Sequence, residues 1–124
     1  SLGNTYYMGA MLKDDEQKEW AESVRIVFPT FEDGGTHVNV SGVAMTKSAP
    51  NRDAALQLMQ FLAGDEAQRI YAETNNEFPV KEGVERSELV ASWGEFTPDD
   101  LTLTEISDLR PQALDLIERV NFDG

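Results

Sequence analysis

Only two segments of this sequence carry a clear β-strand pattern, and that scarcity is the strongest constraint on its fold. Residues 24–28 are rich in β-formers and stop at Pro29, while residues 36–45 alternate polar and apolar side chains with a period of two. Two strands are too few for a self-sufficient sheet. The pattern therefore predicts that the chain pairs its strands with another chain or is a piece of something larger.

Helical patterns account for most of the remaining sequence. The spacing of apolar residues predicts helices over residues 5–13, 14–21, 52–63, 66–74 and 110–120, with short helical turns at 89–90 and 105–108. In the strongest of these, Ala55, Leu58 and Leu62 recur at helical spacing. Thr104 is the predicted cap of the turn at 105–108. Pro111 is expected in the first turn of the last helix, where its missing N–H does no harm.

Composition excludes several classes of function. The formal net charge of −13 repels phosphate backbones, so no nucleic-acid partner is expected. The absence of cysteine excludes disulfides, thiolate metal sites and cysteine nucleophiles. Apolar runs extend over a few residues, whereas a membrane-spanning helix needs about 20. The chain is therefore not expected to span a membrane. No signal peptide is visible, and its absence says little. No nucleophile elbow, phosphate-binding glycine loop or zinc-type histidine pair is visible, so the chain is not expected to be an enzyme.

Several short segments, taken in order, resemble one family. They are Asn-Thr-Tyr-Tyr at 4–7, Phe-Pro at 28–29, Gly-Thr-His-Val-Asn-Val-Ser-Gly at 35–42, Ala-Ala at 54–55, Phe-Leu at 61–62, Glu-Ala-Gln at 66–68, Asn-Glu-Phe-Pro-Val at 76–80 and Trp-Gly at 93–94. Their order and spacing resemble the C-terminal portion of the periplasmic ferric-ion-binding proteins, the substrate-binding components of iron(III) ABC transporters. The resemblance covers essentially the whole chain.

The resemblance implies an α/β fold, the C-terminal portion of a two-lobed type II periplasmic binding protein, helix-rich with few strands. In such proteins the ligand is held in the cleft between the lobes. Residues 1–35 are then part of the second lobe and carry the Tyr-Tyr helix. Residues 36–82 are a crossing strand and part of the first lobe. Residues 83–124 return to the second lobe and end in the C-terminal helix.

Tyr6 and Tyr7 carry the chemistry that the resemblance implies. Iron(III) is a hard cation that prefers anionic oxygen ligands, and phenolate oxygen suits it. A free tyrosine titrates near about 10, so the metal must displace the phenolic proton. A helix start favours an anion, because its N–H groups and its dipole end are positive. The resemblance makes Tyr6 and Tyr7 metal ligands and gives Asn4 a hydrogen bond to the synergistic anion beside the iron.

The function implied is that of a periplasmic solute-binding protein of an ABC importer. It would capture iron(III), together with a synergistic anion, through tyrosine phenolates and deliver the ion to a permease in the inner membrane. In the family the remaining ligands come from the N-terminal portion, so this chain is expected to be a fragment that holds half of the site. Taken alone, it is expected to show the two tyrosines unoccupied or bound to something incidental.

Two other functions stay open. In one, the same fold binds a small organic anion such as a phosphonate, and Tyr6 and Tyr7 donate hydrogen bonds or stack on it. In the other, the chain is a structural or interaction domain without a ligand. A fragment is expected to expose apolar surface where its missing strands would pack, and a dimer or a swapped assembly is one way to cover that surface.

Two other residues invite a site interpretation. His37 is the single histidine, and in the family pattern it lies in the crossing strand, so a buried or hydrogen-bonded structural role is favoured over metal ligation. Glu77 precedes Phe78 and Pro79, where a solvated loop acid is favoured over a residue of the cleft.

Overall fold

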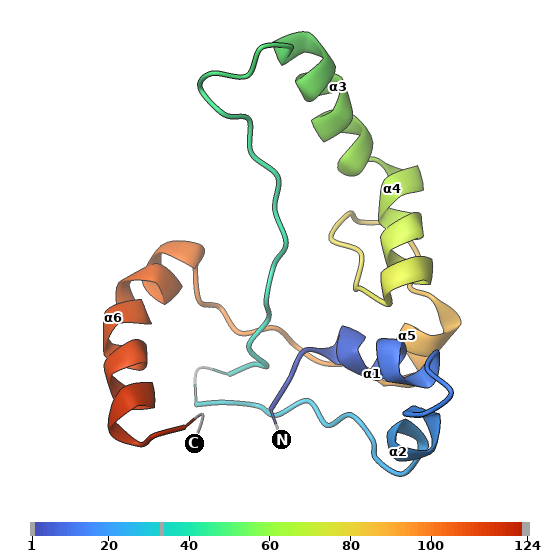
Figure 1. The fold of residues 1–124 in the computed structure, drawn as a ribbon, viewed down its shortest axis with the longest axis vertical. Coiled ribbons are helices and arrows are strands. Elements are labelled where there is room, and N and C mark those ends of the chain that lie inside the picture. The colour runs from blue at the N-terminus through green and yellow to red at the C-terminus, as the bar shows by residue number, and fades with distance from the viewer. Residues whose placement is uncertain (1, 33, 123–124) are drawn as a thin grey trace. The chain divides into compact units, whose positions relative to one another are not determined.

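The computed structural model of the protein describes residues 2–32 and 34–122. Its elements, in chain order, are α1 (Thr5–Leu12), α2 (Lys18–Glu22), α3 (Arg52–Leu62), α4 (Asp65–Ile70), a π-helical turn η1 (Tyr71–Asn75), α5 (Glu88–Ser92) and α6 (Leu103–Arg119) (Figure 1). They form two compact units. Unit 1 comprises residues 2–27 and 39–95, and unit 2 comprises residues 28–38 and 96–122, Asp33 excepted.

Four predicted helices are found where the apolar spacing placed them. These are α1, α3, α4 with its continuation η1, and the short α5. Gly64 is the N-cap of α4, and Asn76 ends η1 in the left-handed conformation at φ 57°. Asn51 occupies the N-cap position of α3 without a side-chain capping bond, so the amphipathic pattern of α3 defines this helix more than its cap does.

The second predicted helix starts later than expected, because Asp14 organises a turn instead of a helix start. The carboxylate of Asp14 accepts hydrogen bonds from the Glu16 N–H at 2.9 Å and from the Gln17 side-chain amide at 2.6 Å. Short acidic side chains compete with helix formation in this way. The helix α2 therefore begins at Lys18, after the acidic run.

The two predicted strands were wrong as regular elements. Residues 24–28 and 36–45 form no strand, and within the described residues the one β-bridge is the parallel pair Thr36–Pro98 (Figure 1). A period-two pattern selects which side chains share a face, but a strand also needs a neighbour for its N–H and C=O groups. Beyond the bridge at Thr36, no segment of the described chain pairs with either stretch.

The last helix is longer than predicted and begins at a different cap. Thr102, not Thr104, caps α6 through a capping box, in which the Glu105 N–H donates to Thr102 Oγ1 at 3.3 Å and the Thr102 N–H donates to Glu105 Oε2 at 2.8 Å. The predicted turn and the predicted helix merge into one element. Pro111 consequently lies inside α6, where it removes one intrahelical hydrogen bond without ending the helix.

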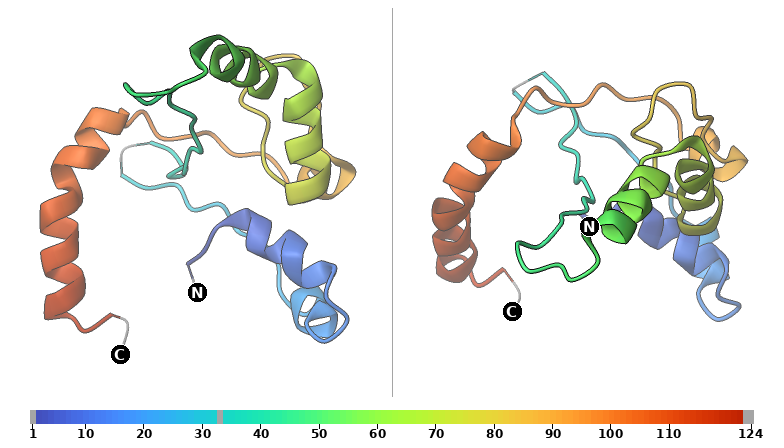
Figure 2. Two further views of the ribbon diagram at one scale, coloured as in Figure 1. Left: turned by 45° about the horizontal axis from the view of Figure 1, so that its top comes forward. Right: turned by 90° about the horizontal axis from the view of Figure 1, so that it is seen from above.

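Unit 1 is assembled around small buried side chains. Its buried apolar residues are Ala21, Ala67, Ala72 and Val90. The buried amide of Gln68 donates to the Leu62 carbonyl at 3.0 Å and accepts from the Val80 N–H at 2.9 Å, which ties α4 to the segment that follows η1. Both views of Figure 2 show α1 beside the end of η1.

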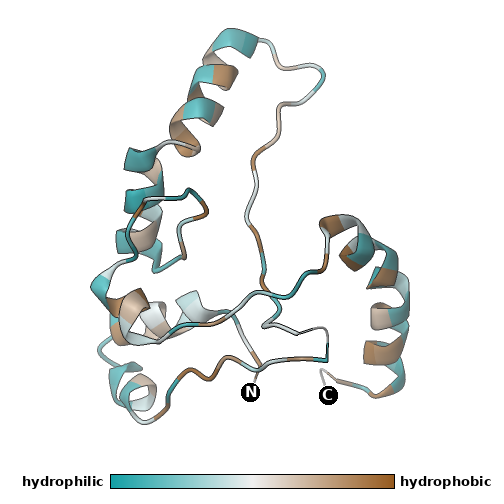
Figure 3. Ribbon diagram, turned by 180° about the vertical axis from the view of Figure 1, so that it is seen from behind, coloured by the Kyte–Doolittle hydropathy of each residue, from teal (hydrophilic) through white to brown (hydrophobic). Residues whose placement is uncertain are grey.

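Many large apolar side chains are exposed, as expected for a fragment that lacks the strands which would pack on them. In unit 2, no residue of α6 is buried, and the helix shows apolar turns in Figure 3. Its most exposed apolar side chains include Leu103 at 71% and Leu116 at 56%. Within the described residues, none of the helices has both the length and the apolar character needed to cross a bilayer.

Candidate metal centre at the start of helix α1

Tyr6 and Tyr7 occupy the first turn of α1, as the sequence predicted. Asn4 is the N-cap residue, with extended backbone angles of φ −74° and ψ 144°, so the chain changes from extended to helical immediately before the two tyrosines. The Tyr7 N–H donates to the Asn4 carbonyl at 3.2 Å. The Asn4 side chain makes no capping hydrogen bond, so capping is not its role.

The two phenol rings lie against each other. Their centroids are 4.7 Å apart with an interplanar angle of 63°, an edge-to-face arrangement. Successive side chains inside a helix diverge by about 100°. At this first turn they instead converge, with Tyr6 partly buried and Tyr7 54% exposed. The two rings therefore lie together at the start of the helix.

The surroundings of Tyr6 keep it protonated. A hydrogen bond with the Tyr7 side chain raises the pKa of Tyr6 above its ordinary value of 10.0, and desolvation and the charges of Tyr7 and Glu77 act in the same direction. Tyr6 is therefore a neutral phenol near pH 7 in the metal-free protein. A cation that binds here as a phenolate complex must displace that proton.

The face of α1 that carries Tyr6 packs on the end of η1. Gly9 is buried, and a Cβ at this position would collide with the side chain of Asn76, which is 4% exposed. The Lys13 ammonium donates to the Thr74 carbonyl at 2.7 Å. The Gly9 approach and the Lys13 bond fix α1, and with it the tyrosine pair, against residues 74–77.

At Glu77 the sequence favoured a solvated loop acid over a residue of the cleft. The structure places it partly buried, with one carboxylate oxygen accepting from the Asn75 side-chain amide at 3.2 Å and with its charge acting on Tyr6. Its position just after the helix-ending Asn75 and Asn76 could have marked it as an ordered carboxylate. Nothing in the sequence pattern, however, brings that segment to α1.

His37 has the hydrogen-bonded role that was expected. Its Nδ1 lies 2.8 Å from Oδ2 of Asp99, whose side chain is 5% exposed, so the pair joins the two segments of unit 2. Among the residues that the structure describes, no three His, Cys, Asp or Glu side chains come together as a metal-binding group.

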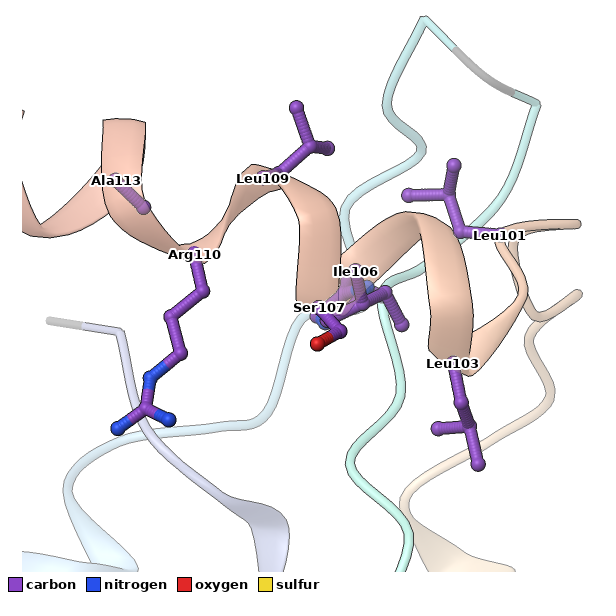
Figure 4. A pocket seen from close by; sticks show the side chains of 8 residues that line it. Leu101, Leu103, Ile106, Ser107, Leu109, Arg110 and Ala113 are labelled. Carbon is purple, nitrogen blue, oxygen red and sulfur yellow. The ribbon is translucent and has the colours of Figure 1, made fainter.

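An apolar hollow lies along α6 in unit 2 and has a different character. It measures about 510 Å³ and is lined by His37, Leu101, Leu103, Ile106, Ser107, Leu109, Arg110 and Ala113 (Figure 4). Among these residues are neither carboxylates nor phenols, which are the oxygen ligands that a hard cation requires. The tyrosine pair in unit 1 is thus the candidate centre.

Comparison with known proteins agrees with this geometry. The pattern of the family described as "Bacterial extracellular solute-binding protein" matches residues 3–98. Iron uptake protein A1 of Synechocystis sp. is 46% identical over 108 residues, which are 86% of this chain and 30% of that protein. The chain thus spans about a third of the length of this relative.

Solved structures extend the likeness to the fold. The apo ferric ion-binding protein A of Pasteurella haemolytica superposes with a TM-score of 0.90 at 48% identity, over 98% of this chain and 38% of that one. A Trichodesmium protein solved in complex with iron and citrate superposes with a TM-score of 0.84 at 34% identity, over 95% of this chain and 38% of that one. These likenesses confirm the predicted fold class, a portion of a two-lobed type II periplasmic binding protein. The chain therefore belongs to the bacterial extracellular solute-binding proteins and corresponds to a part of their ferric-ion-binding members.

Proposed function

We propose that the protein carrying this chain captures iron(III), and that Tyr6 and Tyr7 are two of its ligands. The observation that carries the proposal is the pair of phenol rings 4.7 Å apart in the first turn of α1. The pair occurs in a chain whose relatives are named for iron uptake and ferric-ion binding. Among the described residues, no three His, Cys, Asp or Glu side chains form an alternative group.

The chemistry of the pair suits a ferric ion. Phenolate oxygens are hard, anionic ligands. The N–H groups and the positive dipole end of α1, a helix of eight residues, favour the negative charge that the phenols acquire when they lose their protons. Because the pKa of Tyr6 is raised in the metal-free protein, iron binding is coupled to proton release.

Two phenolates leave an octahedral ferric ion incompletely coordinated. The proposed complement is a set of ligands from other parts of the protein together with a synergistic anion. In this proposal the Asn4 side chain, which makes no capping hydrogen bond, donates a hydrogen bond to that anion. The Trichodesmium neighbour, solved with both iron and citrate, supports an anion beside the metal.

The proposed role is in ABC import. The protein would hold iron(III) in the periplasm and deliver it to a permease of the inner membrane, in keeping with its membership of an extracellular solute-binding family. In this proposal residues 1–35 and 83–124 belong to the second lobe, and residues 36–82 to the crossing strand and the first lobe, so the packing of α1 on η1 is a contact between the two lobes. Closure of two lobes over the ion would proceed by hinge motion at the crossing segments.

The test uses the complete gene product that carries this chain. Titrating the metal-free protein with ferric citrate should produce a visible phenolate-to-iron charge-transfer band. The double variant Tyr6→Phe, Tyr7→Phe should lose this band or bind iron far more weakly. Tyr71→Phe, which alters the one remaining tyrosine of the chain, should behave like the unmodified protein. A protein that stays colourless and indifferent to iron would contradict the proposal.

One observation favours a second candidate, the binding of a small organic anion such as a phosphonate. A Tyr6 that stays protonated is a hydrogen-bond donor, and the half-exposed Tyr7 lies next to it. A thermal-shift screen of ferric salts against organic anions separates the two functions. A shift with phosphonates that is independent of iron would favour this second candidate.

A further inference from the structure

Two separate contacts hold α1 against the end of η1. At the first, the backbone of α1 approaches Asn76 directly, because Gly9 has no side chain that would collide with it. At the second, the Lys13 ammonium donates to the Thr74 carbonyl at 2.7 Å. Residues 6, 9 and 13 are spaced three and four apart, so Tyr6 shares the face that makes both contacts. The helix that carries the tyrosine pair therefore lies on η1 along this face (Figure 2).

The carbonyl that Lys13 binds belongs to the end of a helical segment. η1 ends at Asn75, and Asn76 turns the chain away from it at φ 57°. The last carbonyl groups of a helix lack a partner within it and form the negative end of its dipole. A lysine ammonium, with three donors and a positive charge, suits such a group. Because Lys13 is also the C-cap residue of α1, the bond joins the C-terminal ends of the two elements.

The two contacts constrain α1 in different ways. The Gly9 approach fixes one point of the helix, about which α1 could still swing. The Lys13 bond, four residues further along, fixes a second point and with it the direction of the helix axis. At a rise of about 1.5 Å per residue, Tyr6 lies about 4.5 Å from Gly9 along the axis, so a swing of roughly 10° would displace its backbone by about 0.8 Å. A binding site requires its groups to stay within about 0.5 Å of the productive geometry.

We propose that Lys13 is a positioning residue of the ferric site, whose bond to Thr74 keeps the tyrosine pair of the second lobe aligned with the first lobe. The inference rests on the proposed function of Tyr6 and Tyr7 and on the lobes assigned with it. Lys13 acts through α1 and is not itself a ligand, since an ammonium has no lone pair to offer a cation. Without the bond, α1 spends less time in the orientation that binds iron, and the apparent affinity falls by that fraction.

The experiment compares two lysines in the complete gene product. Lys13→Met keeps the apolar stem of the side chain and removes its ammonium. Lys18→Met removes the same charge from α2, where the ammonium lies 3.9 Å from the carboxylate of Glu22, and serves as the matched control. Each protein is loaded with ferric citrate, and the release of iron to excess chelator is followed by the loss of the phenolate-to-iron band. The free energy of unfolding of each metal-free protein is measured in parallel.

Lys13→Met should release iron about three- to tenfold faster than the unmodified protein, the factor that corresponds to one hydrogen bond. The absorption band should keep its position, because the phenolates remain the ligands. Lys13→Arg restores a charged donor and should bring the release rate most of the way back. Lys18→Met should release iron at the unmodified rate.

Three results would overturn the inference while leaving the phenolate site in place. The first is an equal release rate for Lys13→Met and Lys18→Met. The second is a Lys13→Arg variant that releases iron as fast as Lys13→Met. The third is a lowered free energy of unfolding in Lys13→Met with an unchanged release rate, which would make the bond a structural contact alone. Failure of the proposed function itself looks different, because the unmodified protein would then show no phenolate band at all.

Discussion

The two units of this chain are held together in different ways. Unit 1 contains all four buried apolar residues found in the described chain, and it carries the tyrosine pair. Unit 2 is joined by the Thr36–Pro98 bridge, by the His37–Asp99 contact at 2.8 Å and by stacking of Phe28 on Phe96 at 4.6 Å. Its helix α6 has no buried residue.

This difference shows where a site can be rigid. The tyrosine pair lies on a helix fixed by a close backbone approach at Gly9, so its geometry is set by packing within unit 1. The helix α6 depends instead on its own cap, and its apolar side chains stay uncovered. Changes in unit 1 should therefore affect both stability and iron binding, whereas changes in unit 2 should act locally.

The largest effect should come from Gly9→Ala. An alanine normally stabilises a helix relative to glycine. Here its Cβ would collide with the side chain of Asn76, so the free energy of unfolding should fall by about 2–3 kcal/mol, as for overpacking. Chemical denaturation measures the loss, and citrate competition should show weaker ferric binding. In the control Gly3→Ala the nearest atom would lie 3.7 Å away, and little should change.

The next largest effect should be a difference in stability between truncating a buried apolar side chain of unit 1 and truncating an exposed one of unit 2. Val90 is 0% exposed, and Val90→Ala should lower the free energy of unfolding by about 1.5–2.5 kcal/mol, from the lost methyl groups and the cavity. Leu116 in α6 is 56% exposed, and Leu116→Ala should cost less than about 0.5 kcal/mol. Similar losses in both variants would show that α6 is covered in solution, by a second copy of the chain or by other parts of the protein.

A smaller effect is expected from the cap of α6. Thr102→Ala removes the acceptor of the Glu105 N–H and should destabilise the helix by about 1 kcal/mol. Amide hydrogen exchange should show faster exchange in α6, with no change in α1 or η1. Faster exchange spread through unit 1 would contradict the local character of this helix.

The smallest effect concerns acid pH. Hydrogen bonds from Thr102 lower the pKa of Glu105 below its ordinary value of 4.5. A carboxylate with a lowered pKa stabilises the folded form above that ordinary value, and the contribution is lost as pH falls through the lowered pKa. The exchange of α6 amides should therefore quicken at a pH below 4.5, and Glu105→Gln should remove this dependence. Acid sensitivity that persists in Glu105→Gln would assign it to another group.

Local patterns predicted most of unit 1 and less of unit 2. The amphipathic repeat of α3 and the tyrosine-bearing start of α1 could be read from neighbouring residues. The strand patterns at 24–28 and 36–45 could not become strands, because pairing requires a partner that the described chain does not align with them. The start of α6 could have been predicted from Thr102 and Glu105, which have the spacing of a capping box, although the prediction placed the cap at Thr104.

The candidate site shows the same division between local and long-range information. Tyr6, Tyr7 and Asn4 are adjacent in the sequence, and their order with the other short segments indicated a ferric-ion-binding protein. Residues 74–76 meet α1 through packing that depends on the absence of a side chain at Gly9. A single sequence does not reveal such a contact, since no periodicity links the two segments.

The most direct test of the phenolate site is the number of protons released for each ferric ion bound. The metal-free gene product and its double variant Tyr6→Phe, Tyr7→Phe are titrated with the same ferric complex in weakly buffered solution at neutral pH. If both tyrosines bind iron as phenolates, the unmodified protein releases two more protons per bound ion than the double variant. Equal proton release by the two proteins at equal iron occupancy would contradict ligation by Tyr6 and Tyr7.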